Sequence, residues 1–265
     1  MKKWMLFSVI GIAVGAAAGW ALRARQSEPV PLPPMKTPAA HQAAPVAEAV
    51  PTAVVPPKAP AKAPTVQAET PAANPVPPDN FQTQAADYLL NPQAPYVQRQ
   101  EFLNRLRLEG QLKEVVAELE KRAADDPNNP AIPANLGQAY LLQASLATNS
   151  ISEQGMLGMK ADQTFDRALD LDPNSWEARF WKATAMAHWP AVLNKSREVM
   201  EHYVKLVEQQ EAEPPQPQFA ETYAWLGKEY AKAGYPDYAR QAWERGLAFF
   251  PNHEQLAAQL KELQK

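Results

Sequence analysis

Residues Ala220 to Asn252 read AETYAWLGKEYAKAGYPDYARQAWERGLAFFPN and carry the clearest structural pattern in the chain. Small and large apolar residues follow the spacing of two amphipathic helices joined by a turn, with small residues where the helices touch and large ones filling the gaps. The residues that keep this spacing are Leu226, Gly227, Tyr230, Gly234, Ala239, Trp243, Gly246 and Pro251. The pattern therefore predicts one helix–turn–helix unit.

This unit resembles the tetratricopeptide repeat, because all of these positions agree in order and spacing within one period of about 34 residues. The template returns upstream, where about a dozen additional residues separate the two helices; its positions are Leu136, Gly137, Tyr140, Ala161, Phe165, Ala168 and Pro173. Ser150 followed by Glu153 has capping-box spacing. We therefore expect the second helix of this pair to begin near Ile151 and to be longer than usual.

Two weaker copies, one from Tyr96 and one from Trp176, complete an all-α array of about four helix pairs. The predicted repeats cover residues 96–129, 130–175, 176–219 and 220–253 within a domain spanning residues 81–265. An amphipathic helix over residues 254–265 is expected to cap the exposed face of the last repeat. The residues that depart from the template are Arg122, Pro133 and Lys182, and the boundaries of the first and third repeats stay open.

The amino terminus has the composition of a membrane segment. After residues 1–3, expected to be cytoplasmic, Trp4 to Leu22 form an uncharged stretch long enough to cross a bilayer as a helix. The alternative is a signal peptide cleaved near Ala16–Ala18. Both interpretations export the remaining chain, and the anchor predicts a single-pass protein of the bacterial inner membrane with a periplasmic domain. The small residues Gly11, Gly15 and Gly19 lie on one helix face and suggest a membrane dimer.

Residues 23–80 are rich in proline and alanine, and no aromatic residue lies between Trp20 and Phe81. Such a segment lacks the apolar surface needed to offset its ordering entropy, so we expect a disordered, extended linker. The favoured role is a spacer. The alternative is that PLPP, at residues 31–34, docks in an aromatic groove.

No pattern in the chain indicates catalysis, a metal site or a cofactor. Cysteine is absent, which excludes thiol catalysis and cysteine-ligated metals, and the four histidines lack the spacing of a zinc-protease helix. Phosphate-binding loops and serine-hydrolase motifs are also missing. Residues 81–265 contain 19 Lys and Arg against 25 Asp and Glu, which argues against nucleic-acid binding. We expect a binding protein and not an enzyme.

The resemblance implies a peptide-binding groove lined mainly by the first helix of each pair. The positions that it suggests are Asn104, Arg107, Gln138, Leu141, Phe180, Thr184, Lys228 and Lys232. Lys228 and Lys232 lie four residues apart on one helix face and are candidates to hold a ligand carboxylate. The alternative is that they are surface lysines near Glu229 and Glu221.

A second apolar feature lies in the insertion, where residues 155–159 read GMLGM. These side chains form either an exposed contact patch or part of the contact with a neighbouring repeat.

The predicted function is a membrane-tethered scaffold that binds a protein or peptide segment. Residues 136–145 and 165–187 are also similar to the tetratricopeptide subunits of bacterial cytochrome c maturation, which are membrane-tethered and hold apocytochrome for haem ligation. That similarity implies the same role here as an alternative. A structural envelope spacer, in which linker length matters more than the groove, is the other alternative.

Overall fold

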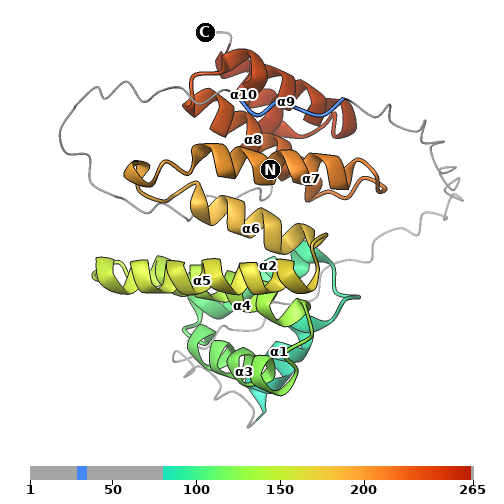
Figure 1. Ribbon diagram of the computed structural model, residues 1–265. Helices are drawn as coiled ribbons and strands as arrows, with labels where there is room; N and C mark the ends of the chain where they lie inside the picture. Colours follow the sequence, from blue (N-terminus) through green and yellow to red (C-terminus); the bar gives the residue numbers. More distant parts are fainter. Residues whose placement is uncertain (1–28, 35–79, 264–265) are drawn as a thin grey trace, which may run out of the picture.

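The computed structural model describes residues 29–34 and 80–263. Within them, ten α-helices and one short 3-10 turn occur and no strand is found (Figure 1). The helices are α1 (Phe81–Leu90), α2 (Tyr96–Leu108), α3 (Leu112–Asp125), α4 (Ala131–Leu146), α5 (Ile151–Leu171), α6 (Trp176–Met186), α7 (Ser196–Gln210), α8 (Phe219–Lys232), α9 (Pro236–Phe249) and α10 (Glu254–Leu263). The 3-10 turn is η1 (Ala191–Leu193).

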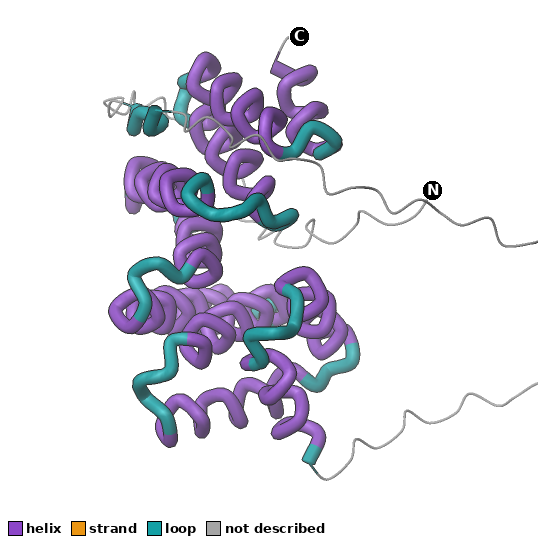
Figure 2. The backbone as a smooth tube through the Cα atoms, turned by 90° about the vertical axis from the view of Figure 1, so that its right-hand side faces the viewer, coloured by secondary structure: helices purple, strands orange, loops and turns teal. Residues whose placement is uncertain are grey.

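The helices form successive pairs that stack into an elongated body, from α1 and α3 at one end to α9 and α10 at the other (Figures 1 and 2). The pairs α4–α5, α6–α7 and α8–α9 each pack helix on helix within the ranges of the last three predicted repeats. Helices α2 and α3 lie in the range of the first, but α3 packs mainly on α4 and α1 and only slightly on α2. Helix α10 packs on α9 and α8, as expected of the cap. Helix α1 packs mainly on α3 and precedes the first predicted repeat; no repeat position in the sequence indicates it.

Two glycines show why the template needs small residues where helices meet. A Cβ atom built on Gly227 would lie 2.1 Å from the Trp243 indole nitrogen, and one on Gly137 would lie 2.5 Å from the Phe165 ring. Both aromatic side chains are buried, and the Trp243 indole donates a hydrogen bond to the Ala224 carbonyl at 3.2 Å. These contacts join α4 to α5 and α8 to α9 at the small and large positions that the repeat pattern predicts.

Local signals set the ends of several helices. The Ser150 hydroxyl accepts a hydrogen bond from the Glu153 amide at 3.1 Å, and α5 begins at Ile151 as predicted. Gly110 and Gly234 follow α2 and α8 with φ angles of 74° and 86°, a backbone conformation that disfavours other residues. These glycines permit the tight turns within their helix pairs.

The residues that depart from the repeat template have structural partners. Arg122 donates to Asp87 at 2.6 Å and to the Thr83 carbonyl at 3.1 Å, which ties α3 to α1. Pro133 lies in the first turn of α4, where its missing N–H has no helical acceptor.

Lys182 is buried in α6 and contacts Asp162 at 2.6 Å and Asp166 at 3.0 Å on α5. Burial disfavours its charge, but the hydrogen bonds with the two carboxylates outweigh it and raise the pKa of Lys182. The departure of Lys182 from the repeat template is therefore explained by an ion-pair network that joins α5 and α6.

Several predictions fall outside the residues that the structure describes. They are the anchor at residues 4–22, the helix face formed by Gly11, Gly15 and Gly19, and the linker except for residues 29–34 and residue 80. None of the described helices combines the length and the apolar composition that a membrane span requires.

Candidate functional site

Residues 29–34, PVPLPP, lie on the carboxyl-terminal repeats, where the blue segment in Figure 1 passes α9 and α10. We call residues 29–34 the docked segment. Val30 and Leu32 are half-buried and pack against the hydrophobic core, whereas Pro31 and Pro34 are exposed. Pro29 and Pro33 are also half-buried, so the two exposed prolines are three residues apart, which is the repeat of an extended polyproline II helix. Here the structure differs from the disordered linker that composition predicted.

The helices hold the docked segment through its backbone carbonyls. The Tyr230 hydroxyl at the end of α8 donates to the Val30 carbonyl. Arg245 on α9 donates through Nη1 to the Pro33 carbonyl at 2.5 Å and through Nη2 to the Pro34 carbonyl at 3.3 Å. Proline lacks an N–H group, so its carbonyl is the backbone group that a protein can bind.

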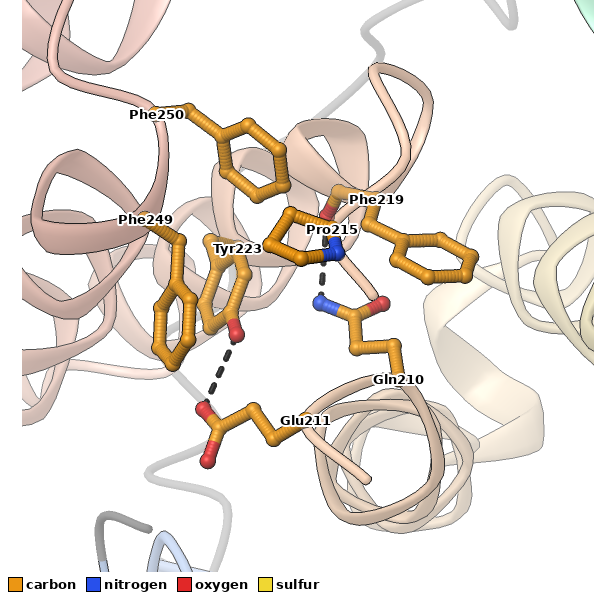
Figure 3. A pocket seen from close by; sticks show the side chains of 7 residues that line it. All are labelled: Gln210, Glu211, Pro215, Phe219, Tyr223, Phe249 and Phe250. Carbon is orange, nitrogen blue, oxygen red and sulfur yellow. Dashed lines mark hydrogen bonds between the residues drawn. The ribbon is translucent and has the colours of Figure 1, made fainter. Parts of the chain in front are cut away.

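Arg245 is held in place by Glu211, which directly follows α7. Its Nε and Nη2 atoms lie 2.6 Å and 2.5 Å from the two Glu211 carboxylate oxygens, and the side chains of the pair are only 7% and 2% exposed. Glu211 also accepts a hydrogen bond from the Tyr223 hydroxyl at 2.9 Å (Figure 3). Burial is the main reason that the pKa of Tyr223 is raised, so this hydroxyl remains a donor.

A small cavity lies beside this cluster, between the end of α7 and the start of α8. Its volume of about 10 Å³ has room for about one water molecule. Figure 3 shows its lining residues: Gln210, Glu211, Pro215, Phe219, Tyr223, Phe249 and Phe250. Gln210 closes one side, because it donates to the Phe219 carbonyl at 3.1 Å and accepts from the Trp176 indole at 3.1 Å. The cavity is too small for a side chain of a partner.

The structure buries three residues that the resemblance placed in the groove. Gln138, Phe180 and Thr184 are 2%, 2% and 3% exposed. Phe180 stacks on Trp176 with ring centroids 4.6 Å apart, and the hydroxyls of Thr184 and Tyr203 lie 2.9 Å apart. These residues lie on the expected helices but at contacts between helices. As placed, they form core and not ligand-binding surface.

Three other groove candidates are partly accessible. Arg107 donates to the Asn104 side-chain oxygen at 2.8 Å, and the two residues form a half-buried polar pair on α2. Leu141 on α4 is half-buried and packs against the hydrophobic core. These residues retain surface that a ligand can contact.

Lys228 and Lys232 are exposed on α8, as the spacing predicted. The Lys228 ammonium lies 4.4 Å from the centre of the Trp225 ring. Lys232 donates to the Ala187 carbonyl at 3.1 Å and lies 3.4 Å from the carboxylate of buried Glu229. Burial raises the pKa of Glu229, and Lys232 opposes that shift. The pairing of Lys232 with Glu229 agrees with the surface-lysine alternative.

Residues 155–159, for which the sequence left open an exposed contact patch or a buried contact with a neighbouring repeat, show both environments. Met156 and Met159 are exposed on the first turns of α5, whereas Leu157 is buried. Together with Ile151, Ser152 and Gly155 the two methionines line a shallow, open hollow on this helix.

Sequence reasoning missed the docked segment's partners, Tyr230 and Arg245. PLPP is a docking motif in one of the two interpretations of the linker, but no local signal identifies the same chain as its partner. The one available hint is Arg245, a charged residue beside Gly246 at the contact stripe of its helix.

No protein-family model matches the chain, and no match was found among curated proteins. Among solved structures, the chain is similar to two crystal structures of MamA. One is 18% identical with a TM-score of 0.46 and covers 61% of this chain and 81% of that chain. The other is 17% identical with a TM-score of 0.46 and covers 69% and 81%.

A third structure is YrrB, described as a TPR protein with an unusual peptide-binding site. It is 19% identical with a TM-score of 0.34 and covers 61% of this chain and 89% of that chain. None of these comparisons bears on the similarity to cytochrome c maturation subunits, which stays a prediction.

Proposed function

We propose that this chain is a membrane-tethered scaffold that binds an extended segment of another protein on its helical repeats. The observation that carries the proposal is the docked segment, since the repeats already hold an extended polypeptide by its backbone and its apolar side chains. A surface that binds one segment through carbonyls is suited to segments of other proteins.

The surface of α2, α4 and α8 supplies further contacts for a partner. Its accessible candidates are Asn104, Arg107, Leu141, Lys228 and Lys232. Lys228 and Lys232 bring two ammonium groups to one side of α8, and Glu229 balances only one charge there. The proposed partner segment therefore carries a carboxylate or an acidic side chain opposite α8.

The proposed location is the periplasmic face of a bacterial inner membrane, with residues 4–22 as the anchor. The support is the uncharged length of this segment and the preceding Lys2 and Lys3, which favour a cytoplasmic amino terminus. The repeats then project from the membrane on residues 23–80. The Gly11, Gly15 and Gly19 face is the proposed contact if the anchor forms a dimer.

Fractionation of cells that express the full chain tests the anchor. We expect the protein in the membrane pellet after alkaline extraction, and digestion of its helical domain by protease added to spheroplasts. Release of the whole protein into the periplasmic fraction would instead support the cleaved signal peptide. Protection of the domain in spheroplasts would contradict the proposed orientation.

Site-specific photo-crosslinking in the same cells tests partner binding. A photoreactive residue replaces Lys228 or Arg107, and Lys205 on α7 is the matched control because it is a comparably exposed lysine. We expect the same partner band from Lys228 and Arg107 and little from Lys205. Equal labelling at Lys205, or no specific band at Lys228 and Arg107, would contradict partner binding on this surface.

A further inference from the structure

We infer that the surface around Tyr230 and Arg245 is a recognition site for proline-rich extended segments, that residues 29–34 are its ligand within the chain, and that a proline-rich segment of a partner competes for it. This inference deepens the proposed function and rests on it, because the competing segment belongs to the partner of the scaffold.

The donors of this site match the chemistry of a proline-rich ligand. Each hydrogen bond that joins the docked segment to the other described residues is accepted by a carbonyl of Val30, Pro33 or Pro34. The site supplies a hydroxyl and a guanidinium for these carbonyls. An ordinary extended strand also brings an N–H at every residue, which would need acceptors of its own. Four of the six residues in the docked segment are proline and bring none.

The guanidinium is oriented before any ligand arrives. The bidentate contact with Glu211 fixes the plane of Arg245, and Tyr223 fixes Glu211 in turn. A pre-oriented donor loses little freedom when a ligand binds, which favours binding. Without a carbonyl opposite Nη1, the nearly buried Arg245 would have an unsatisfied donor. The arrangement of Arg245, Glu211 and Tyr223 therefore favours a bound carbonyl opposite the guanidinium.

Two apolar positions provide the selectivity for side chains. Val30 and Leu32 face the core at every second residue, and prolines flank each of them. The ligand class is thus an apolar residue, proline, a second apolar residue and two prolines. Residues 54–57, VVPP, and 75–78, PVPP, contain part of this pattern but have no leucine before the paired prolines. They are natural comparisons for the role of Leu32.

Competition at this site would change the maximum distance between the proposed membrane anchor and the helical domain. With residues 29–34 docked, only residues 23–28 separate the proposed anchor from α8 and α9, a span of about 20 Å at most when fully extended. With the segment released, residues 23–80 separate the anchor from α1 and span about 180 Å at the polyproline II rise of about 3.1 Å per residue. Partner binding at Tyr230 and Arg245 would therefore lengthen the tether.

A distance measurement on the full chain in detergent micelles tests the inference. Because the chain has no cysteine, spin labels attach only at Lys36→Cys, two residues past the docked segment, and at Gln241→Cys on the exposed side of α9. We expect one short, narrow distance distribution. Leu32→Asp should replace it with a long, broad one, because a carboxylate would be placed against the core.

The competing ligand is a synthetic peptide of residues 27–36, SEPVPLPPMK. It should convert the short distance to the long distribution, and it should bind the Leu32→Asp chain at least tenfold more tightly than the native chain, where the attached segment competes at high effective concentration. Tyr230→Phe removes one hydrogen bond and should weaken peptide binding by about three- to tenfold. Lys205→Ala, on the exposed side of α7 and outside the site, should change neither the distance nor the affinity.

Three outcomes would overturn the inference. The first is a native chain without the short distance, or a short distance that survives Leu32→Asp. The second is a Leu32→Asp chain that fails to bind the peptide. The third is equal displacement by SEAVALAAMK, which would remove the requirement for proline. These readouts are independent of membrane fractionation and of crosslinking at Lys228, so failure here is distinguishable from failure of the proposed scaffold.

Discussion

The pairs α4–α5 and α8–α9 share one internal contact and differ on their outer surfaces. In each pair a glycine on the first helix packs against an aromatic ring of the second: Gly137 against Phe165, and Gly227 against Trp243. However, α5 has 21 residues and α9 has 14. The additional turns of α5 expose apolar side chains, whereas α9 is covered in part by the docked segment.

The comparison shows that the glycine–aromatic contact determines how two helices meet and leaves the rest of each helix free to differ. Gly155 and Gly158 on the first turns of α5 have no atom within 4 Å of a built Cβ, in contrast with Gly137 and Gly227. The same residue type therefore has a packing role in one part of a repeat and none in another.

The largest effect is expected when the shared contact is removed. Phe165→Ala and Trp243→Ala should each lower the free energy of unfolding by about 3–5 kcal/mol, because each leaves a cavity between two helices. Chemical denaturation of the full chain in detergent, followed by circular dichroism, measures the loss. Met159→Ala on the exposed part of α5 is the control and should change stability by less than about 0.5 kcal/mol. If either aromatic variant lost little free energy of unfolding, the aromatic contact would not have the same role in the two pairs.

A smaller effect is expected when the glycine is changed instead. Gly137→Ala and Gly227→Ala should each cost about 1–3 kcal/mol, since the new methyl group overlaps the facing ring. Gly155→Ala is the matched control and should stabilise the protein by up to about 1 kcal/mol, because alanine is the better helix former and has open space. Thermal unfolding of the three variants gives the comparison. Destabilisation by Gly155→Ala similar to that of Gly227→Ala would contradict the distinction.

Release of the docked segment should affect only one of the two pairs. Leu32→Asp should lower stability by about 1 kcal/mol, as expected for loss of a half-buried leucine contact. Hydrogen exchange should become faster in α8 and α9 and stay unchanged in α4 and α5. Pro31→Ala, at an exposed position of the same segment, is the control for general changes in the chain. Faster exchange throughout the domain would show that the segment is not a local partner of α8 and α9.

The smallest expected effect is an opposite response to pH of two carboxyl groups: Glu120 on α3, which contacts the pair α4–α5, and Glu229 on α8. The Tyr140 hydroxyl donates to Glu120 at 2.5 Å and lowers the pKa of that carboxyl, with burial opposing the shift and Lys160 adding to it. This contribution to stability is present above the ordinary pKa of glutamate and is lost as the pH falls through the lowered value. The advantage of the native chain over Glu120→Gln should therefore shrink on acidification.

Glu229 on α8 should respond in the other direction. Burial raises its pKa in the folded chain, so its contribution is fully present below the ordinary pKa and is lost as the pH rises through the raised value. The native chain should thus gain stability relative to Glu229→Gln between neutral pH and pH ~4. Melting temperatures across this range measure both trends. A parallel response of the two variants would refute the assigned causes.

The features that the sequence predicted correctly are those set by residues close together in the chain. The pairs α4–α5, α6–α7 and α8–α9, the start of α5 near Ile151 and the terminal cap were predicted, because helical periodicity and capping act over a few residues. Helix α1 was not recognised as a separate element, since its ten residues match no repeat position. Phe180 and Thr184 were assigned to the right helix and the wrong environment, because both contact Tyr203 on the neighbouring helix α7.

The amino-acid sequence by itself determined the helix pairs, since the contacts that specify a pair lie within about one repeat. Only the tertiary structure decided which faces are buried and where residues 29–34 lie. Arg245 lies one repeat period of 34 residues from Glu211 but more than 200 residues from Pro33, and Pro33 belongs to no repeat, so no periodicity in the chain links the docked segment to its site. Their contact depends on how successive repeats stack, and a buried ion pair that orients a donor exists only after that stacking has excluded water.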